Sequence, residues 1–156
     1  MNSRVEPAVI LLVEDNPDHS ELIARVLDEF DIPKRLVHVT DGETALDYLL
    51  RRAQFADPAT SPQPNIVLLD LQLPRLNGFE VLQAIKNSVE MRHIPVVIVT
   101  TSSAERDIRL AYQRYANSYL VKPVDFQQFT QMLHDLGNYW LGWNQQVGEQ
   151  PINTSS

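Results

Sequence analysis

The sequence lacks cysteine throughout its 156 residues. Disulfide bonds and thiolate metal sites are therefore excluded. No stretch reaches the roughly eighteen consecutive apolar residues of a membrane-spanning helix, and the N-terminal residues lack the layout of a signal peptide. We therefore expect a cytoplasmic protein without membrane contact. Basic residues are also few: the net charge is −7, and without a concentrated basic patch a nucleic-acid backbone would repel the chain.

The remaining composition is that of an ordinary globular protein, with 44% apolar and 21% charged residues. The length suits one domain with a sizeable core. We expect a single domain over residues 1–143, with its core at about 8–141. A polar tail at 144–156 is expected to be disordered. The four histidines are scattered without metal-ligand spacing, which indicates structural or solvated roles.

Short apolar runs alternate with amphipathic segments along the chain. The runs typical of strands lie at 8–13, 35–39, 65–70, 94–100 and 118–121. Helical spacing of apolar residues follows each run: after Asn16, at 40–50, from Gly78, around 104–115 and around 126–140. This alternation predicts an α/β fold, a five-stranded parallel sheet with helices on both faces. The proline-rich stretch at 55–64 is predicted to be an exposed loop.

Acidic side chains stand where two of the predicted strands end. Glu14 and Asp15 follow the first strand, and Asp70 closes the third. Ligands of open parallel sheets bind at the carboxyl ends of the strands. If the first and third strands are neighbours, three carboxylates converge there, and they cannot all stay ionised without a cation. Oxygen ligands without histidine or cysteine favour Mg²⁺.

Two more polar side chains belong to the same predicted edge of the sheet. Thr100 ends the fourth strand, and Lys122 follows the fifth. A carboxylate nucleophile at Asp70, a metal ion, an ammonium group and a hydroxyl together describe a site for a phosphoryl group. Each residue alone also has an ordinary interpretation, as a helix cap or a solvated lysine. Their conjunction at one end of the sheet favours the functional interpretation.

Four segments resemble the marker segments of bacterial response-regulator receiver domains, the CheY-like proteins. They are "LLVEDN", "VLLDLQLPRLNG", "VVIVTT" and "YLVKP". The resemblance covers about residues 8–141 and implies the flavodoxin-like (βα)5 fold with strand order 2-1-3-4-5. It also implies that Asp70 is the phosphoacceptor, that Asp15 binds Mg²⁺ directly and that Glu14 does so through water.

The same resemblance assigns further roles by position. The backbone carbonyl of Gln72 would be another metal ligand, and Lys122 would bind the phosphoryl group. Thr100 and Tyr119 would be the switch hydroxyl and the switch aromatic residue. The resemblance also suggests a cis peptide bond between Lys122 and Pro123.

A finer resemblance connects the chain with the small stand-alone regulators of cyanobacterial phytochrome kinases. It rests on the loop at 55–64, "LPRLNG", "IPVVIVTTSSAERDI" and "NYW". It implies a phytochrome-type histidine kinase as the phosphoryl donor and output through protein contacts. Thr101 stands where this family usually has a small alanine, so phosphoryl entry is expected to be slower. We also expect the side chains of Gln72 and Ser102 to tune the loss of the phosphoryl group to water.

Two surfaces are candidates for partner binding. The start of the first helix borders the site and would receive the kinase, although a solvated helix start explains each of its residues equally well. The last helix carries aromatic residues off its apolar stripe, which favours a homodimer through the fourth helix, fifth strand and fifth helix. The candidate residues are Asn16, Pro17, His19 and Ser20 on the first surface and Tyr139 and Trp143 on the second.

Three functions remain open at this point. The first is a phosphorylation-controlled binding module that is not an enzyme, beyond Mg²⁺-dependent self-phosphorylation and dephosphorylation. The second is a pseudo-receiver that acts only as a scaffold. The third is a Mg²⁺-dependent phosphohydrolase. Such phosphatases commonly place a second aspartate two residues after the nucleophile, where this chain has Gln72.

Overall fold

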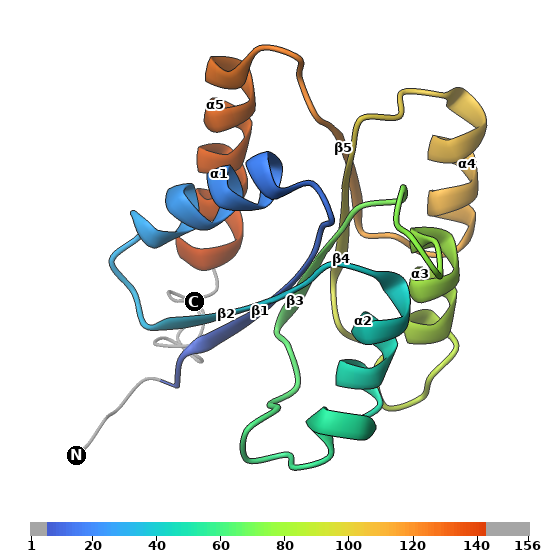
Figure 1. Cartoon of the computed structure of the whole chain (residues 1–156). Helices are drawn as coiled ribbons and strands as arrows, with labels where there is room; N and C mark the ends of the chain where they lie inside the picture. Colours follow the sequence, from blue (N-terminus) through green and yellow to red (C-terminus); the bar gives the residue numbers. More distant parts are fainter. Residues whose placement is uncertain (1–5, 143–156) are drawn as a thin grey trace, which may run out of the picture.

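The computed structural model describes residues 6–142, in which five parallel strands form one sheet (Figure 1). The strand order β2-β1-β3-β4-β5 confirms the prediction. The strands are β1 (Ala8–Val13), β2 (Lys34–Val39), β3 (Ile66–Leu69), β4 (Val96–Thr100) and β5 (Ser118–Val121). β4 begins two residues later than predicted, because Pro95 has no N–H to donate to a neighbouring strand.

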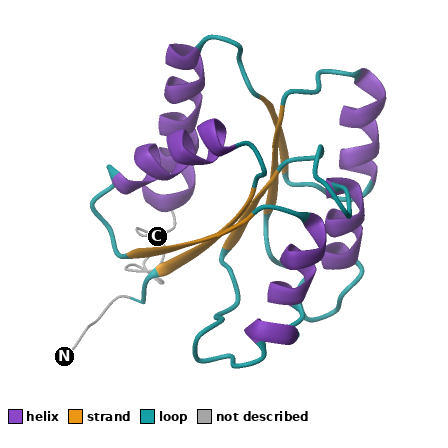
Figure 2. Ribbon diagram, in the orientation of Figure 1, coloured by secondary structure: helices purple, strands orange, loops and turns teal. Residues whose placement is uncertain are grey.

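Helices cover both faces of the sheet, as predicted. Helices α1 and α5 lie on one face, and α2, α3 and α4 lie on the other (Figures 1 and 2). The bounds are α1 (Pro17–Asp28), α2 (Gly42–Leu49), α3 (Gly78–Lys86), α4 (Glu105–Gln113) and α5 (Phe126–Gly137). A 3₁₀ turn, η1 (Ala53–Phe55), follows α2, and a π-helical turn, η2 (Asn138–Gly142), follows α5.

The central strands are apolar on both faces because each face is covered. In β1, Leu11 and Val13 pack toward α2, α3 and α4, whereas Ile10 and Leu12 pack toward α1 and α5. All residues of β3 and β4 are buried. This two-sided burial explains why the sequence shows continuous apolar runs instead of alternation. It also explains why a carboxylate directly after β3 lies in a largely buried position.

Two glycines permit close approaches that shape the site end of the sheet. A Cβ atom on Gly78 would overlap the carbonyl oxygen of Asp70 and crowd Leu71, so the start of α3 lies directly against the segment after β3. A Cβ atom on Gly42 would likewise overlap the carbonyl oxygen of Leu76. The backbone after β3 therefore packs closely against the start of α3, and the backbone at Leu76 against the start of α2.

The C-terminal part of the described chain differs from the predicted single long helix. α5 ends at Gly137, against which the ring of Phe30 packs, and η2 continues from there. Trp140 is partly buried against the core on the α1 and α5 side, as its spacing predicted, and Tyr139 is 61% exposed. Trp143 and the tail at 144–156 lie outside the described residues.

Two further expectations can be compared with the structure. No cis peptide bond occurs in the described chain, so the expected cis bond between Lys122 and Pro123 is wrong; the bond has the trans form, which X-Pro bonds favour intrinsically. The loop at 55–64 is partly exposed and is fastened by the Tyr48 hydroxyl, which donates to the carbonyl of Pro62 (2.6 Å).

Within residues 6–142, no helix is long and apolar enough to cross a membrane.

Candidate functional site

Three carboxylates meet at the carboxyl end of β1 and β3, as the sequence predicted. Oxygen atoms of Glu14, Asp15 and Asp70 all lie within 4.8 Å of one another. β1 pairs with β3 in parallel, and the backbone N–H of Asp70 donates to the carbonyl of Val13 (3.1 Å). This register places the two strand ends side by side. Glu14 and Asp70 are buried, and Asp15 is exposed.

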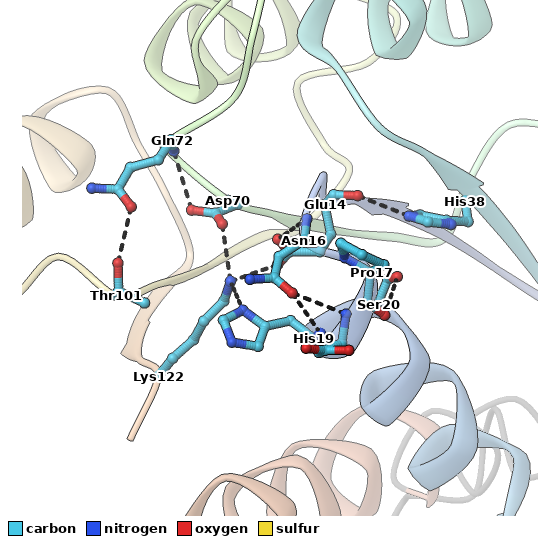
Figure 3. Close-up of polar contacts among 11 residues, drawn as sticks. Glu14, Asn16, Pro17, His19, Ser20, His38, Asp70, Gln72, Thr101 and Lys122 are labelled. Atoms are coloured by element: carbon cyan, nitrogen blue, oxygen red, sulfur yellow. Dashed lines mark hydrogen bonds and ion pairs between the residues drawn. The ribbon is translucent and has the colours of Figure 1, made fainter. Parts of the chain in front are cut away.

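Lys122 joins the two buried carboxylates from the segment after β5. Its Nζ donates to Oε1 of Glu14 (2.6 Å) and to Oδ2 of Asp70 (2.9 Å) (Figure 3). The Lys122 side chain is only 2% exposed, so this ion-pair network has little contact with water. A third acceptor, Nδ1 of His19, lies 2.9 Å from the same nitrogen. The ammonium group is thereby fixed beside Asp70.

The remaining hydrogen bonds of the carboxylates come from the backbone. The N–H of Asn16 donates to Oε2 of Glu14 (3.1 Å), and the N–H of Gln72 donates to Oδ1 of Asp70 (3.1 Å). Burial raises the pKa of Glu14 to about 7 and outweighs the hydrogen bond from Lys122. The negative charge of Asp70 raises this pKa further. Burial and the neighbouring carboxylate therefore disfavour the charged form of Glu14.

Thr100 has a buried hydroxyl that lacks a hydrogen-bond partner. Thr100 ends β4 and is fully buried. Its Oγ1 is the one buried side-chain nitrogen or oxygen atom in the described chain that has no hydrogen-bond partner. An unsatisfied buried hydroxyl is costly, and such groups usually have a functional explanation. A ligand oxygen at this end of the sheet would satisfy it.

Tyr119 connects β5 with the segment between β4 and α4. Its hydroxyl donates to the backbone carbonyl of Ser102 (2.9 Å), and burial raises its pKa. The Ser102 hydroxyl in turn donates to Oδ2 of Asp107 in the first turn of α4 (2.6 Å). A continuous hydrogen-bonded path therefore runs from β5 to the start of α4.

A side-chain bridge spans the two loops next to Asp70. The Thr101 hydroxyl donates to Oε1 of Gln72 (2.9 Å), and both residues are exposed (Figure 3). From the sequence, the side chains of Gln72 and Ser102 are expected to tune the loss of the phosphoryl group to water. In the structure the partner of Gln72 is Thr101, and the Ser102 hydroxyl is engaged with Asp107.

The start of α1 borders the site, and several of its residues also stabilise the first turn of the helix. Asn16 caps the helix by accepting from the N–H groups of Asp18 and His19. Pro17 occupies the first turn, where its missing N–H costs nothing. Ser20 is buried, and its hydroxyl donates to the carbonyl of Pro17 (3.2 Å). Of the four candidate contact residues, Asn16 and Pro17 are exposed and His19 is half-buried, so these three present surface here.

The chemistry of the site fits a hard divalent cation. The three convergent side chains supply carboxylate oxygens, the ligands that Mg²⁺ and similar ions prefer. Burial and a neighbouring negative charge raise the pKa of Glu14, and the positive charge of a cation would offset both effects. The residues present are thus suited to divalent metal binding.

Comparison with known proteins identifies the family. Residues 10–134 match the response regulator receiver domain. The chain belongs to this family. Receiver domains are generally non-enzymatic switches that receive a phosphoryl group from kinases.

Several receiver proteins are similar over most of their length. "Probable methanogenesis regulatory protein FilR2" of Methanothrix harundinacea is 43% identical over 143 residues, which cover 92% of this chain and 90% of FilR2. Response regulator Rcp1 of Synechocystis sp. is 38% identical over 135 residues, or 86% of this chain and 90% of Rcp1.

Solved structures of relatives have the same fold. The Mn²⁺-bound form of Rcp1 superposes with a TM-score of 0.83 over 86% of this chain and 95% of Rcp1. The phosphorylated cyanobacterial phytochrome response regulator RcpA also gives 0.83, at 35% identity, over 87% of this chain and 95% of RcpA. The chain is thus a response regulator similar to phytochrome response regulators, and the metal in Rcp1 agrees with the acidic cluster seen here.

Sequence reasoning missed two contacts at the receiver site. The sequence indicates a structural or solvated role for His19, or a contact with the kinase, whereas its ring nitrogen lies against Lys122. Thr101 was considered only for its size, although it binds Gln72. The position of His19 in the first turn of a helix that begins directly after the acidic pair was the available signal.

Proposed function

We propose that Asp70 accepts a phosphoryl group from a histidine kinase, and that this modification switches the protein contacts of the domain. The observation that carries the proposal is the position of the Asp70 carboxylate. It lies between the ammonium of Lys122 at 2.9 Å and the oxygens of Glu14 and Asp15 within 4.8 Å. A nucleophile, a fixed positive charge and a metal-ligand set thus occur together.

The chemical step is a transfer between two nucleophiles. A carboxylate oxygen of Asp70 attacks the phosphorus of a phosphohistidine, a new O–P bond forms as the N–P bond breaks, and the freed imidazole nitrogen takes up a proton. Lys122 stabilises the negative oxygens of the transferred group. The partnerless hydroxyl of Thr100 supports the proposal, since it is free to donate to a phosphoryl oxygen.

The metal would be Mg²⁺, held by Glu14, Asp15, Asp70 and the backbone carbonyl of Gln72. When bound, the ion supplies positive charge that offsets the negative oxygens gathered around phosphorus. With the same ion we expect slow self-phosphorylation from small phosphodonors, followed by loss of the phosphoryl group to water.

The switch would proceed from Thr100 to α4, β5 and α5. If Thr100 turns toward a phosphoryl oxygen, the space beside the Tyr119 ring changes. Tyr119 is tied to the carbonyl of Ser102, and Ser102 to the first turn of α4. Phosphorylation would thus shift the population between two arrangements of this half of the domain.

The test is intact-mass spectrometry after incubation with a small phosphodonor and Mg²⁺. We expect the mass to rise by one phosphoryl group in the wild-type protein and to stay unchanged in Asp70→Asn. An adduct that persists in Asp70→Asn contradicts the assignment. No adduct in the wild type favours the pseudo-receiver scaffold, and rapid turnover of unrelated phosphate esters favours the phosphohydrolase. Phosphohydrolases of this kind commonly carry an acid-base aspartate at the position of Gln72. The glutamine found there argues against the phosphohydrolase.

A phytochrome-type kinase is the proposed donor, acting in the cytoplasm through the surface beside Asn16, Pro17 and His19. The similarity to Rcp1 and RcpA supports this choice. Phosphotransfer from such a kinase, compared with an unrelated histidine kinase, tests it. Equal rates from both donors would contradict the preference.

Homodimerisation is proposed through the half formed by α4, β5 and α5. Large apolar side chains are exposed on and beside these elements: Tyr112, Tyr115, Val121, Val124, Phe126 and Tyr139. Exposed apolar side chains gathered in one patch are typical of interaction surfaces, and these residues are the candidates for such a patch. Sedimentation at micromolar concentration is the test, and a strict monomer with and without phosphorylation contradicts the dimer.

A further inference from the structure

The ammonium group of Lys122 has three hydrogens and three acceptors. Two acceptors are the carboxylates of Glu14 (2.6 Å) and Asp70 (2.9 Å). The third is Nδ1 of His19, at 2.9 Å (Figure 3). An ammonium donates three hydrogen bonds and accepts none, so the set is complete. His19 is the uncharged member of this set.

The contact determines the protonation state of the imidazole. Because Lys122 donates, Nδ1 must carry a free lone pair, and the neutral ring then carries its proton on Nε2. Burial and the positive charge of Lys122 both lower the pKa of His19, and the negative charges of Asp70, Asp18 and Asp15 oppose this effect in part. A neutral acceptor is therefore favoured beside the ammonium.

Contacts from both α1 and α5 fix the position of the His19 ring. The N–H of His19 donates to the cap residue Asn16, which fixes the first turn of α1. The imidazole meets the ring of Phe129 edge-on, with 5.6 Å between the ring centroids. Phe129 is fully buried in α5. Nδ1 is therefore presented to Lys122 by two packed helices and not by a free side chain.

We infer that His19 is a positioning residue for phosphoryl transfer, which keeps the ammonium of Lys122 directed at the Asp70 carboxylate. This inference rests on the proposed function of Asp70. In the resting site one N–H of Lys122 points to Asp70, and that hydrogen must turn to a phosphoryl oxygen when the group arrives. The contacts with Glu14 and His19 hold the other two hydrogens, so the ammonium keeps its place during the exchange.

Without His19, the third hydrogen of the ammonium would turn to water. The long lysine side chain would then be fixed chiefly by its shortest ion pair, the one with Glu14. Time spent away from Asp70 lowers the fraction of molecules that are ready to receive the phosphoryl group. The effect belongs to the transfer step, since the carboxylate nucleophile itself is untouched.

Three variants separate the acceptor from the packing. In His19→Asn the amide oxygen takes the place of Nδ1, so the hydrogen bond is retained. In His19→Gln the amide group takes the place of Nε2 instead. In His19→Leu an apolar side chain keeps the contact with Phe129 but offers no acceptor. Thermal unfolding of each variant verifies that the fold is retained.

The measurement is the rate of self-phosphorylation from a small phosphodonor at saturating Mg²⁺. We expect His19→Leu and His19→Gln to be slower by about tenfold, the size expected for one charge-assisted hydrogen bond. His19→Asn should stay within about twofold of the wild type by the same reasoning. Wild-type rates in His19→Leu, or a rate in His19→Asn as low as in His19→Leu, overturn the inference.

A spectroscopic readout of the unphosphorylated protein complements the rates. Nitrogen-15 chemical shifts of the His19 ring should report a neutral imidazole with its proton on Nε2, and a proton on Nδ1 overturns the inference. If the wild type is phosphorylated and the rate in His19→Leu is unchanged, this inference alone is overturned. A wild type that gains no phosphoryl group overturns the proposed function, and this inference with it.

Discussion

Replacing Lys122 by methionine should destabilise the unphosphorylated, metal-free protein strongly. The substitution keeps an apolar stem of similar length and removes the ammonium that joins Glu14 and Asp70. Both carboxylates are then left buried, and within residues 6–142 each keeps one backbone N–H as its hydrogen-bond donor, from Asn16 and Gln72. The side chains of Glu14 and Asp70 are 1% and 6% exposed, so water cannot solvate them well.

The size of the loss follows from the buried ion pairs. Removing one partner of a buried pair costs about 3–5 kcal/mol, because an uncompensated charge remains. The pKa of Glu14 is already raised to about 7 by burial, so this group can take up a proton and limit the penalty. We therefore expect the free energy of unfolding at pH 7 to fall by about 3 kcal/mol, the lower end of that range.

Urea unfolding followed by circular dichroism, with a chelator present, measures this loss. A matched triple variant carries Lys122→Met with Glu14→Gln and Asp70→Asn, which removes the three charges of this buried network together. It should recover most of the lost stability, and Mg²⁺ should partly rescue Lys122→Met alone by replacing the missing positive charge. A loss below about 1 kcal/mol, or a triple variant no more stable than Lys122→Met, would refute the reasoning.

Three other predictions concern the surroundings of the site. Gly78→Ala should lower the free energy of unfolding by about 2 kcal/mol in urea titrations, because its Cβ overlaps the Asp70 carbonyl, and an unchanged value would contradict this. Burial raises the pKa of Asp41, but hydrogen bonds from Thr44 outweigh it and the pKa is lowered. Asp41 therefore stabilises the fold at neutral pH and loses this effect as the pH falls, so the stability gap to Asp41→Asn should narrow below about pH 4 and not widen. Thr101→Val, which breaks the bridge to Gln72, should shorten the half-life of the phosphorylated protein by about two- to fivefold, and an identical decay would contradict a role for the bridge.

The fold was predictable because burial on both faces leaves a plain signal in the sequence. The runs that became β1, β3 and β4 are apolar without interruption, and the intervening helices carry one apolar stripe each. Parallel strands bring their carboxyl ends to one edge, so the meeting of Asp15, Asp70 and Lys122 followed from topology. The segment boundaries were less predictable, because proline at 95 and the change to η2 after Gly137 act locally.

The finer contacts of the site depend on how distant elements pack, and the sequence does not encode them in any short pattern. The contact between Lys122 and His19 joins residues 103 positions apart, and it requires the start of α1 to lie beside the segment after β5. The bridge between Thr101 and Gln72 joins two loops that meet only because β3 and β4 are neighbours. The trans form of the bond before Pro123 likewise has no local signature, since both forms are accessible to X-Pro bonds.

The most direct test of the central claim is to find which atom carries the phosphoryl group. Borohydride reduces an aspartyl phosphate to homoserine, so the reaction marks the modified residue permanently. After treatment with a phosphodonor and Mg²⁺, peptide mass spectrometry should find homoserine at position 70, and none when the metal is chelated. Modification of Glu14, Asp15 or His19 in place of Asp70, or no modification at all, would contradict the claim.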